Sequence, residues 1–206
     1  MGKYVVMSDS TKQKILQSAT NVFVVKGYSR TRMRDISEDA GINKGLLHYY
    51  FKTKKTLFTE VLKISAEDFF PRLDSILHSD KTFFEKLELI VDEYIEIVSK
   101  NPHFPPFIIN ELNHNTDLFV ETLLDNVKTP DKAFVFALVQ EEIASGRIRP
   151  INPLQFILDV LSLILYPFLA KPGLQKISGM SDIQFYDFMR LRKRTIVDTL
   201  INNIKI

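Results

Sequence analysis

Residues 30–58 read RTRMRDISEDAGINKGLLHYYFKTKKTLF, and this stretch decides the fold. Two short segments with apolar residues at helical spacing flank Ala40-Gly41-Ile42, and the basic run Lys52-Thr53-Lys54-Lys55 follows them. A glycine between two such segments favours a tight turn, because glycine adopts positive φ angles without steric cost. The pattern predicts a helix-turn-helix whose second segment enters DNA.

A further helix is expected directly before this stretch, from Ser10 to Lys26. Ser10 and Gln13 have the spacing of a capping box, in which each side chain satisfies an otherwise unpaired backbone N–H group. Gly27 is expected to supply the left-handed residue that ends the helix. The first fifty or so residues are therefore predicted to form three helices.

The third of these helices has two different faces. Asn43 is expected to cap it, as Thr31 is expected to cap the second helix. One face is apolar and consists of Leu47, Tyr50 and Phe51. The other face projects Lys44, Gly45, His48 and Tyr49. Plain structural helices remain an alternative, although the positive charge, a mid-helix glycine and an exposed aromatic residue argue against it.

Charge is distributed unevenly along the chain. The net charge is +2, but residues 1–60 hold 11 Lys or Arg against 5 Asp or Glu. A basic front on a mildly acidic remainder is typical of a DNA-binding head on a neutral body. The chain has no cysteine, which excludes disulfides and thiolate metal sites and fits a reducing cytoplasm. Residues 1–8 show no signal-peptide pattern, so a cytoplasmic location is expected.

The remaining residues predict an all-α protein of about nine or ten helices. One helix is expected from residue 53 or 54 to about residue 78 with a bend at Pro71, and Thr129-Pro130 and Asn152-Pro153 have the pattern of helix starts. Residues 171–180 are expected to form a loop, and Ser181 with Gln184 a second capping box. Residues 154–170 are the most apolar window, but they are too short for a membrane span and contain Asp159, so a buried helix is expected.

The opening stretch resembles the DNA-binding head of the TetR family of transcriptional regulators. The resemblance covers about residues 10–58, roughly a quarter of the chain. The positions that match the family pattern are Gly27, Tyr28, Thr31, Met33, Ile36, Ala40, Gly41, Lys44, Gly45, Leu47, Phe51, Lys54 and Leu57. The chain departs from the pattern at Arg32, Ser37, Asn43, Leu46 and His48, which leaves the operator sequence open.

The resemblance implies a helix-turn-helix domain over residues 1–52 and a helical regulatory and dimerisation domain over residues 53–206. It implies that the third helix enters the major groove of double-stranded DNA and that two heads act on a palindromic operator. Lys44 is the best candidate for reading a base, since a lysine reaches guanine O6 or N7. Gly45 allows close approach, and Leu46 either contacts a thymine methyl or packs in the head. The remaining candidates, expected to hold phosphates, are Thr31, Arg32, Asn43, His48, Tyr49 and Lys54.

Family members usually bind a small molecule in the body and dimerise through the last two helices. The last helix offers an apolar stripe for a partner, made of Phe185, Phe188, Met189, Ile196, Leu200 and Ile204. Apolar walls with a few polar anchors predict an apolar or aromatic effector. The candidate residues for that pocket are Phe104, Phe107, Glu111, His114, Phe134, Gln140 and Tyr166.

The leading interpretation is a homodimeric repressor that an unidentified small molecule releases from its operator. The alternative is a DNA-binding adaptor controlled by a protein partner, which a body without a pocket would favour. An enzyme is not expected, because no known catalytic motif occurs and the histidines are scattered. No cofactor, metal site or membrane association is expected.

Overall fold

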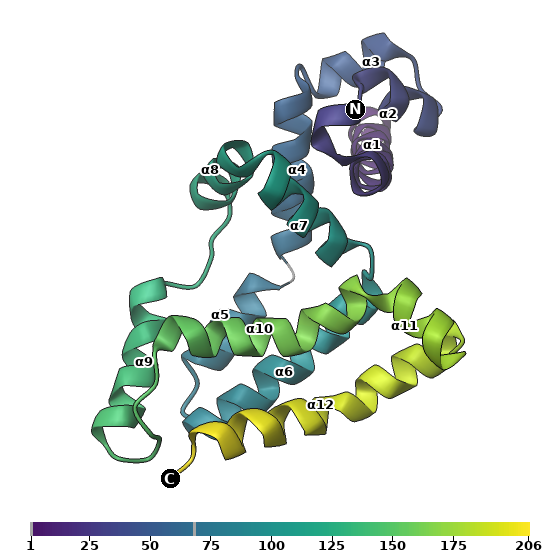
Figure 1. Ribbon diagram of the computed structural model, residues 1–206. Coiled ribbons are helices and arrows are strands. Elements are labelled where there is room, and N and C mark those ends of the chain that lie inside the picture. Colours follow the sequence, from purple (N-terminus) through teal and green to yellow (C-terminus); the bar gives the residue numbers. More distant parts are fainter. Residues whose placement is uncertain (1, 68) are drawn as a thin grey trace. The chain divides into compact units, whose positions relative to one another are not determined.

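The computed structural model describes the backbone of residues 2–67 and 69–206, and the side chains of residues 10–67 and 69–206. These residues form helices α1 to α12 joined by short connections, and within them the single β-bridge pairs Ile148 with Lys205 (Figure 1). The predicted all-α class is confirmed. The chain divides into two compact units: the first is Met1–Asp68 with Pro106–Lys128, and the second is Phe69–Pro105 with Thr129–Ile206. The predicted functional boundary at residues 52 and 53 stays a prediction.

The first unit gathers the N-terminal helices around a small aromatic core. Its helices are α1 (Gly2–Arg30), α2 (Met33–Asp39), α3 (Lys44–Tyr50), α4 (Lys54–Glu67), α8 (Thr116–Asn126) and α7 (Phe104–His114) from residue 106 onward. The most buried side chains there include Ile15, Ala19, Phe23, Ile36, Leu57 and Phe58. Helix α1 packs against α2 and α4, and α4 packs against α8. The short α3 packs against α2, which in turn rests on the longer α1.

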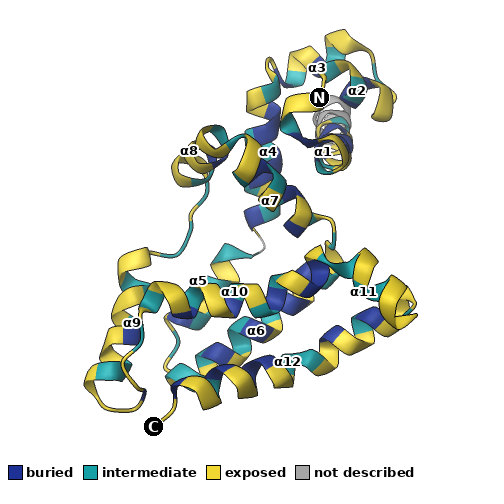
Figure 2. Ribbon diagram, viewed as in Figure 1, coloured by how far each residue is buried: buried dark blue, intermediate teal, exposed yellow. Residues whose placement is uncertain are grey.

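The second unit is a helical body with a larger core. Its helices are α5 (Phe70–Leu77), α6 (Phe83–Lys100), α9 (Lys132–Ala144), α10 (Pro153–Leu169), α11 (Lys171–Ser178) and α12 (Asp182–Ile204). Helix α12 lies along α6, and α10 contacts both of them. Figure 2 shows the buried residues of this unit on the faces that α6, α10 and α12 turn toward one another. Burying apolar area in this way is the main favourable term in folding.

Helix starts follow the expected capping chemistry at three of the predicted places. The Asn43 carboxamide oxygen accepts from the Leu46 N–H group at 2.8 Å. The Asn152 side chain caps α10 ahead of Pro153, and Ser181 forms its capping box with Gln184. Each cap satisfies N–H groups that lack a partner inside the helix.

Three other predicted helix starts are wrong. Helix α1 extends back to Gly2, which places Ser10 inside the helix and not at its N-cap. Arg32, not Thr31, caps α2, because the Thr31 hydroxyl donates to the Gly27 carbonyl at 2.7 Å and so turns back toward α1. Helix α9 begins after Asp131, whose carboxylate accepts from Ala133 N–H at 2.8 Å, and not at Thr129-Pro130.

The helix count exceeds the prediction because two segments behave differently from their sequence pattern. The helix expected over residues 53–78 is divided into α4 and α5, with Pro71 near the start of α5, where a missing N–H group costs little. Residues 171–180, expected to be a loop, contain helix α11, which Gly179 ends in the left-handed conformation with φ 73°. Both changes lie in the body and leave the predicted fold class intact.

The apolar stripe predicted on the last helix lies mostly inside the subunit. Five of its six residues are buried, and they are Phe185, Met189, Ile196, Leu200 and Ile204. They belong to the same core as residues of α6 and α10, which is why a 3.6-residue period appears in the sequence. Among the described residues no single helix is long and apolar enough to cross a membrane, and only α10 with α11, bent by 64°, reaches that length as a pair.

Candidate functional site

Helix α3 presents a polar, basic face on the first unit. Leu47 and Phe51 anchor it, with 1% and 3% of their surface exposed, as the periodicity predicted. Tyr50 is half-buried and meets the Tyr49 ring edge-on, with centroids 5.4 Å apart. The residues left exposed along this helix and at its cap are Asn43, Lys44, Gly45, His48 and Tyr49. Leu46 is half-buried, between its two predicted environments.

The capping of α3 explains why a glycine occupies position 45, which the sequence did not reveal. A Cβ atom at this position would lie 3.3 Å from the Asn43 Oδ1 atom, which is tighter than ordinary van der Waals contact. That oxygen accepts the hydrogen bond that caps α3. A glycine at residue 45 therefore protects the cap, and it also leaves the start of α3 without a side chain that would hold a ligand away.

The turn between α2 and α3 is held by backbone geometry and one buried hydroxyl. Gly41 has φ 61°, and the Ile42 N–H group donates to the Ser37 carbonyl at 3.0 Å. Ser37 is buried and its hydroxyl donates to the Arg34 carbonyl at 2.9 Å. The substitution of serine for the family's alanine is therefore accommodated by a satisfied hydrogen bond.

The start of α2 is fixed by Asp35. Its carboxylate accepts from the Arg32 N–H group at 2.8 Å and lies 3.1 Å from the Lys26 ammonium. The hydrogen bond from the Arg32 backbone, followed by that from Lys26, holds the pKa of the Asp35 carboxyl below its usual value. Arg32 itself keeps an exposed side chain at the N-terminal end of α2, a position that suits contact with a phosphate.

Thr31 and Lys54 make hydrogen bonds inside the first unit, and their assignment as side-chain contacts to phosphate stays a prediction. Thr31 is 1% exposed. The Lys54 ammonium donates to the Tyr28 and Thr31 carbonyls, both at 2.9 Å, and lies 4.2 Å from the centre of the Tyr28 ring. Burial lowers the pKa of Lys54, and the negative charge of Glu111 opposes that shift. These bonds tie the start of α4 to the end of α1.

Glu111 is a buried carboxylate that holds the end of α1 to α7 within the first unit. None of its surface is exposed. Its Oε1 atom accepts from the Tyr28 N–H group at 2.8 Å and from the Asn110 amide at 3.3 Å, and its Oε2 atom accepts from the Asn115 amide at 2.7 Å. Burial, and then the Glu111 charge, raise the pKa of the Tyr28 phenol. Glu111 therefore connects α1 and α7 within the first unit, and its role as a ligand anchor stays a prediction.

Gly27 makes this connection possible. Its φ and ψ angles are 74° and 164°, a region that side-chain-bearing residues rarely enter. A Cβ atom there would lie 3.0 Å from the Asn110 amide nitrogen and 3.2 Å from Glu111 Oε1. The predicted positive φ is confirmed, but the helical turn resumes to Arg30, so Gly27 kinks α1 and does not end it.

Aromatic rings fill the space beside this connection. Phe58 of α4 contacts Tyr28 and Phe23 at centroid distances of 4.7 Å and 5.2 Å. Phe107 of α7 meets Phe58 edge-on at 6.1 Å and is 2% exposed. Such tilted and edge-on pairs are the favoured geometry of buried aromatic rings. Phe107 therefore belongs to the core of the first unit, and its predicted contact with a ligand stays a prediction.

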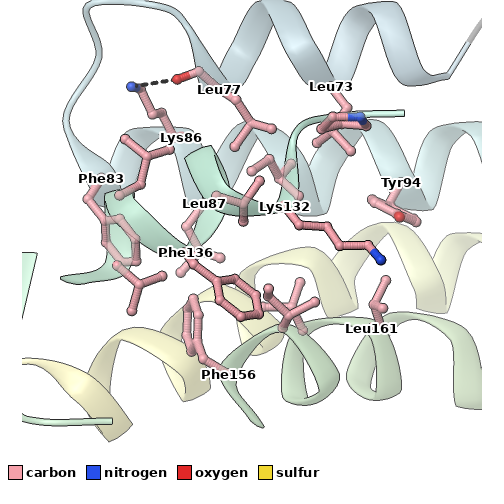
Figure 3. A pocket seen from close by; sticks show the side chains of 17 residues that line it. Leu73, Leu77, Phe83, Lys86, Leu87, Tyr94, Lys132, Phe136, Phe156 and Leu161 are labelled. Carbon is pink, nitrogen blue, oxygen red and sulfur yellow. Dashed lines mark hydrogen bonds between the residues drawn. The ribbon is translucent and has the colours of Figure 1, made fainter. Parts of the chain in front are cut away.

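A cavity of about 230 Å³ lies in the second unit, between α5, α6, α9 and α10 (Figure 3). Its walls are almost entirely apolar, and its polar groups come from Lys86, Lys132 and Tyr94. The apolar residues that line it include Leu77, Leu87, Phe136, Val139, Phe156 and Val160. A concave apolar space with few polar groups is the usual form of a small-molecule site.

None of the seven predicted pocket residues lines this cavity. Beside Phe107 and Glu111, His114 bonds to the Asn110 carbonyl, and Phe134 stacks on His78 at 4.2 Å. Phe104 is half-buried outside the lining, Gln140 is exposed, and Tyr166 is 65% exposed. The cavity supports the prediction of an apolar pocket. The assignment of these seven residues to a ligand site stays a prediction, because single aromatic residues at helical spacing do not reveal which face of a helix borders a void.

The sequence contained a signal for two of the residues that were missed. Tyr94 and Lys86 occupy α6 among the apolar side chains that face the core, where a hydroxyl or an ammonium group is out of pattern. Within the described residues, no cluster of three or more His, Asp or Glu side chains has the arrangement of a metal site.

Comparison with known proteins decides the family. Residues 15–61 match the model of the bacterial regulatory proteins of the tetR family. The transcriptional repressor KstR2 of Mycolicibacterium smegmatis is 31% identical over 145 residues, which cover 68% of this chain and 69% of that protein. The chain belongs to the TetR family. It is a DNA-binding transcriptional regulator.

Other relatives extend over nearly the whole chain. The "Probable HTH-type transcriptional regulator YttP" of Bacillus subtilis is 27% identical over 183 residues, or 87% of each protein. The solved structure of the transcriptional regulator FadR from Bacillus subtilis in complex with stearoyl-CoA has a TM-score of 0.62 and 16% identity. The alignment covers 92% of this chain and 97% of FadR. The shared fold therefore includes the body as well as the head.

Proposed function

We propose that this TetR-family protein is a repressor whose dimer binds a palindromic operator and leaves it when a small apolar molecule occupies the body. The observation that carries the proposal is the exposed face of α3, which projects Lys44, His48 and Tyr49 above a buried anchor of Leu47 and Phe51. The repressor name of KstR2 supports the direction of control. A regulator of this kind acts on bacterial DNA, which places it in the cytoplasm, and we assign it no catalytic activity.

The proposed DNA contacts are divided by chemistry. Lys44, at the first position of α3, reads a guanine, and the missing side chain at Gly45 lets the helix approach the groove. Contacts to phosphate fix the register without reading sequence, and we assign them to Arg32, Asn43, His48 and Tyr49. Leu46 adds an apolar contact to a thymine methyl through the part of its side chain that stays accessible.

Replacing Lys44 with alanine should weaken operator binding by about thirtyfold, because one base contact is worth roughly 2 kcal/mol. The preference for guanine at one position of each half-site should also relax. Fluorescence anisotropy with the operator and with single-base variants measures both effects. Lys81→Ala, which removes an exposed lysine of the second unit, is the matched control. An equal loss for all DNA sequences would show that Lys44 holds a phosphate and does not read a base.

We propose that the dimer forms through α10 and α12, which contact each other in the subunit. Apolar side chains remain exposed on both helices: Leu158 is 51% exposed on α10, and Ile183 and Leu191 are each 77% exposed on α12. Phe188, the one exposed member of the predicted stripe, lies one turn from Leu191 and is 42% exposed. Apolar residues gathered in this way favour burial by a second copy of the chain.

Leu191→Glu should convert the dimer into a monomer at micromolar concentration, because two like charges would face each other across a symmetric interface. Light scattering coupled to gel filtration measures the mass directly. Leu124→Glu is the control, since Leu124 is 57% exposed on α8 of the first unit. A Leu191→Glu protein that keeps the mass of the wild-type dimer would place the interface elsewhere.

The cavity of the second unit supports a small-molecule effector over a protein partner. A body without a cavity was the expectation for an adaptor, whereas this one contains about 230 Å³ of apolar space. An effector releases DNA only through a difference in affinity between two conformations, however tightly it binds. The FadR structure contains stearoyl-CoA, and its apolar acyl chain is consistent with an apolar effector for this fold.

Val135→Phe should abolish effector response while leaving operator affinity within about twofold. Val135 is half-buried and lines the cavity, so an added ring occupies the space that a ligand needs. The measurement is release of labelled operator by a panel of small apolar and aromatic compounds. Val120→Phe, on an α8 residue that is 36% exposed, is the control for added bulk. Compounds that release operator equally from the wild-type protein and from Val135→Phe would contradict the cavity as the effector site. A panel that releases operator from neither protein would favour control by a protein partner.

A further inference from the structure

The charged residues that line the cavity are all positive. Seventeen residues line it, and none of them is Asp or Glu, whereas two are lysines. The Lys86 ammonium donates to the Leu77 carbonyl at 2.8 Å, so this lysine closes the end of α5 as well as bordering the space. Lys132 differs, because among the described residues its ammonium has no ion-pair or hydrogen-bond partner. Figure 3 shows the Lys132 side chain reaching across the cavity toward the end where Tyr94 lies.

Tyr94 brings a hydroxyl to the same end. Its ring meets Phe69 edge-on, with centroids 4.3 Å apart, and the side chain is half-buried. Burial raises the pKa of the Tyr94 phenol, so the hydroxyl keeps its proton at neutral pH and is available as a donor. Within the part of the chain that the structure describes, this hydroxyl has no hydrogen-bond partner. The hydroxyl stays accessible, so it can donate to a ligand that enters the cavity.

We propose that the cavity takes a small organic monocarboxylate, whose apolar body lies among the α6, α9 and α10 side chains and whose carboxylate accepts from Lys132 Nζ and Tyr94 Oη. The inference rests on the proposed effector function and names the chemical class of that effector. A carboxylate satisfies both donors at once, and it places a negative charge beside the Lys132 ammonium, which has no hydrogen-bond partner among the described residues. A neutral ligand leaves Lys132 to solvent, and an amine places a second positive charge beside it.

The volume limits the size of the apolar body. A cavity of about 230 Å³ lies below the usual range of small-molecule sites, so it suits a compact apolar body. An eighteen-carbon acyl chain with a coenzyme A head, such as FadR holds, is far larger than this space. A medium-length aliphatic acid, or an acid with one aromatic ring, is the right size.

Isothermal titration calorimetry of the full-length protein without DNA tests the inference, with octanoate, octan-1-ol and octylamine as matched probes. The variants are Lys132→Met, which keeps the length of the side chain without its charge, and Tyr94→Phe, which removes only the hydroxyl. Lys176→Met, an exposed lysine of α11 outside the cavity lining, controls for net charge. Circular dichroism establishes that each variant is folded.

Octanoate should bind the wild-type protein at least about tenfold more tightly than octan-1-ol or octylamine, as expected for a charge-assisted hydrogen bond. Lys132→Met should raise the octanoate Kd by about tenfold and Tyr94→Phe by about fivefold, with octan-1-ol affinity unchanged in Lys132→Met. Lys176→Met should bind all three probes as the wild type does, and Val135→Phe should bind none.

The inference is overturned if octan-1-ol matches octanoate, if Lys132→Met binds octanoate normally, or if octanoate shows no binding at millimolar concentration. Release of labelled operator, measured separately, tests the proposed function. Octanoate that binds through Lys132 without releasing operator would contradict the function and leave the carboxylate site standing. A neutral compound that releases operator through the cavity, while octanoate fails to bind, would support the proposed function and contradict the carboxylate site.

Discussion

Glu111→Ala is expected to lower the free energy of unfolding of the first unit by about 3 kcal/mol. The substitution leaves the Tyr28 N–H group and the Asn115 amide without their buried acceptor, at hydrogen-bond distances of 2.8 Å and 2.7 Å. It also removes a side chain with no exposed surface. Urea unfolding followed by native-state hydrogen exchange measures the change and assigns it to helices of this unit.

Two control variants separate the roles of the Glu111 carboxylate. Glu121→Ala, at an exposed residue of α8, should change stability by less than about 0.5 kcal/mol. Glu111→Gln keeps one acceptor oxygen for Tyr28 but turns an N–H₂ group toward Asn115, so an intermediate loss of about 1 kcal/mol is expected. A Glu111→Ala protein as stable as Glu121→Ala would show that these hydrogen bonds contribute nothing net.

Gly27→Ala is expected to cost about 3 kcal/mol and to weaken operator binding. The backbone at φ 74° and ψ 164° is strained for alanine by roughly 1–3 kcal/mol. The new methyl group would also press on Asn110 and Glu111, 3.0 Å and 3.2 Å away. Relief requires α1 to straighten or the Tyr28–Glu111 bond to open, and either change disturbs the helix on which α2 rests.

Gly179→Ala provides a matched comparison for the Gly27 variant. Gly179 has φ 73° and ψ 9°, and a Cβ atom there would meet nothing within 4 Å. Its substitution should therefore lower the free energy of unfolding only by the cost of placing alanine in the left-handed conformation, about 1 kcal/mol. Thermal and urea unfolding of both variants measure the difference. Equal losses for the two glycines would show that packing against Glu111 is unimportant.

The head could be read from sequence because its determinants are local. Asn43 caps α3 by accepting a hydrogen bond from the residue three positions later. Gly41 forms the turn through its own positive φ angle, and the buried residues Leu47 and Phe51 are about one helical turn apart. Thr31 shows the limit of such reasoning. Its spacing suits an N-cap, but the Gly27 carbonyl, four residues earlier, lies within reach of its hydroxyl, and that competing local bond is made instead.

Interactions between distant residues account for most of what the sequence did not show. Glu111 and Tyr28 are 83 positions apart, and a single acidic residue on an amphipathic helix is equally compatible with solvent, ligand or a buried backbone N–H group. The periodic stripe of α12 indicated burial correctly, but periodicity cannot say whether the covering helix belongs to the same chain or to a partner. Packing against α6 and α10 decided that question.

The cavity was hidden for a related reason. Its wall combines residues from four helices, and the space exists because their side chains fail to fill the gap between them. A sequence reports which residues are apolar and does not report a void. Lys132 and Tyr94 can be identified as candidate ligand contacts only when α9 and α6, which carry them, are placed around that void.

Selection of bound duplexes from a random DNA pool by the purified wild-type protein tests whether α3 reads DNA. We expect enrichment of an inverted repeat whose half-sites lie one helical turn apart, roughly 34–36 Å. Each half-site should contain a guanine preference that disappears when the selection is repeated with Lys44→Ala. A pool that shows no inverted repeat after selection would contradict the assignment of α3 as the helix that reads DNA.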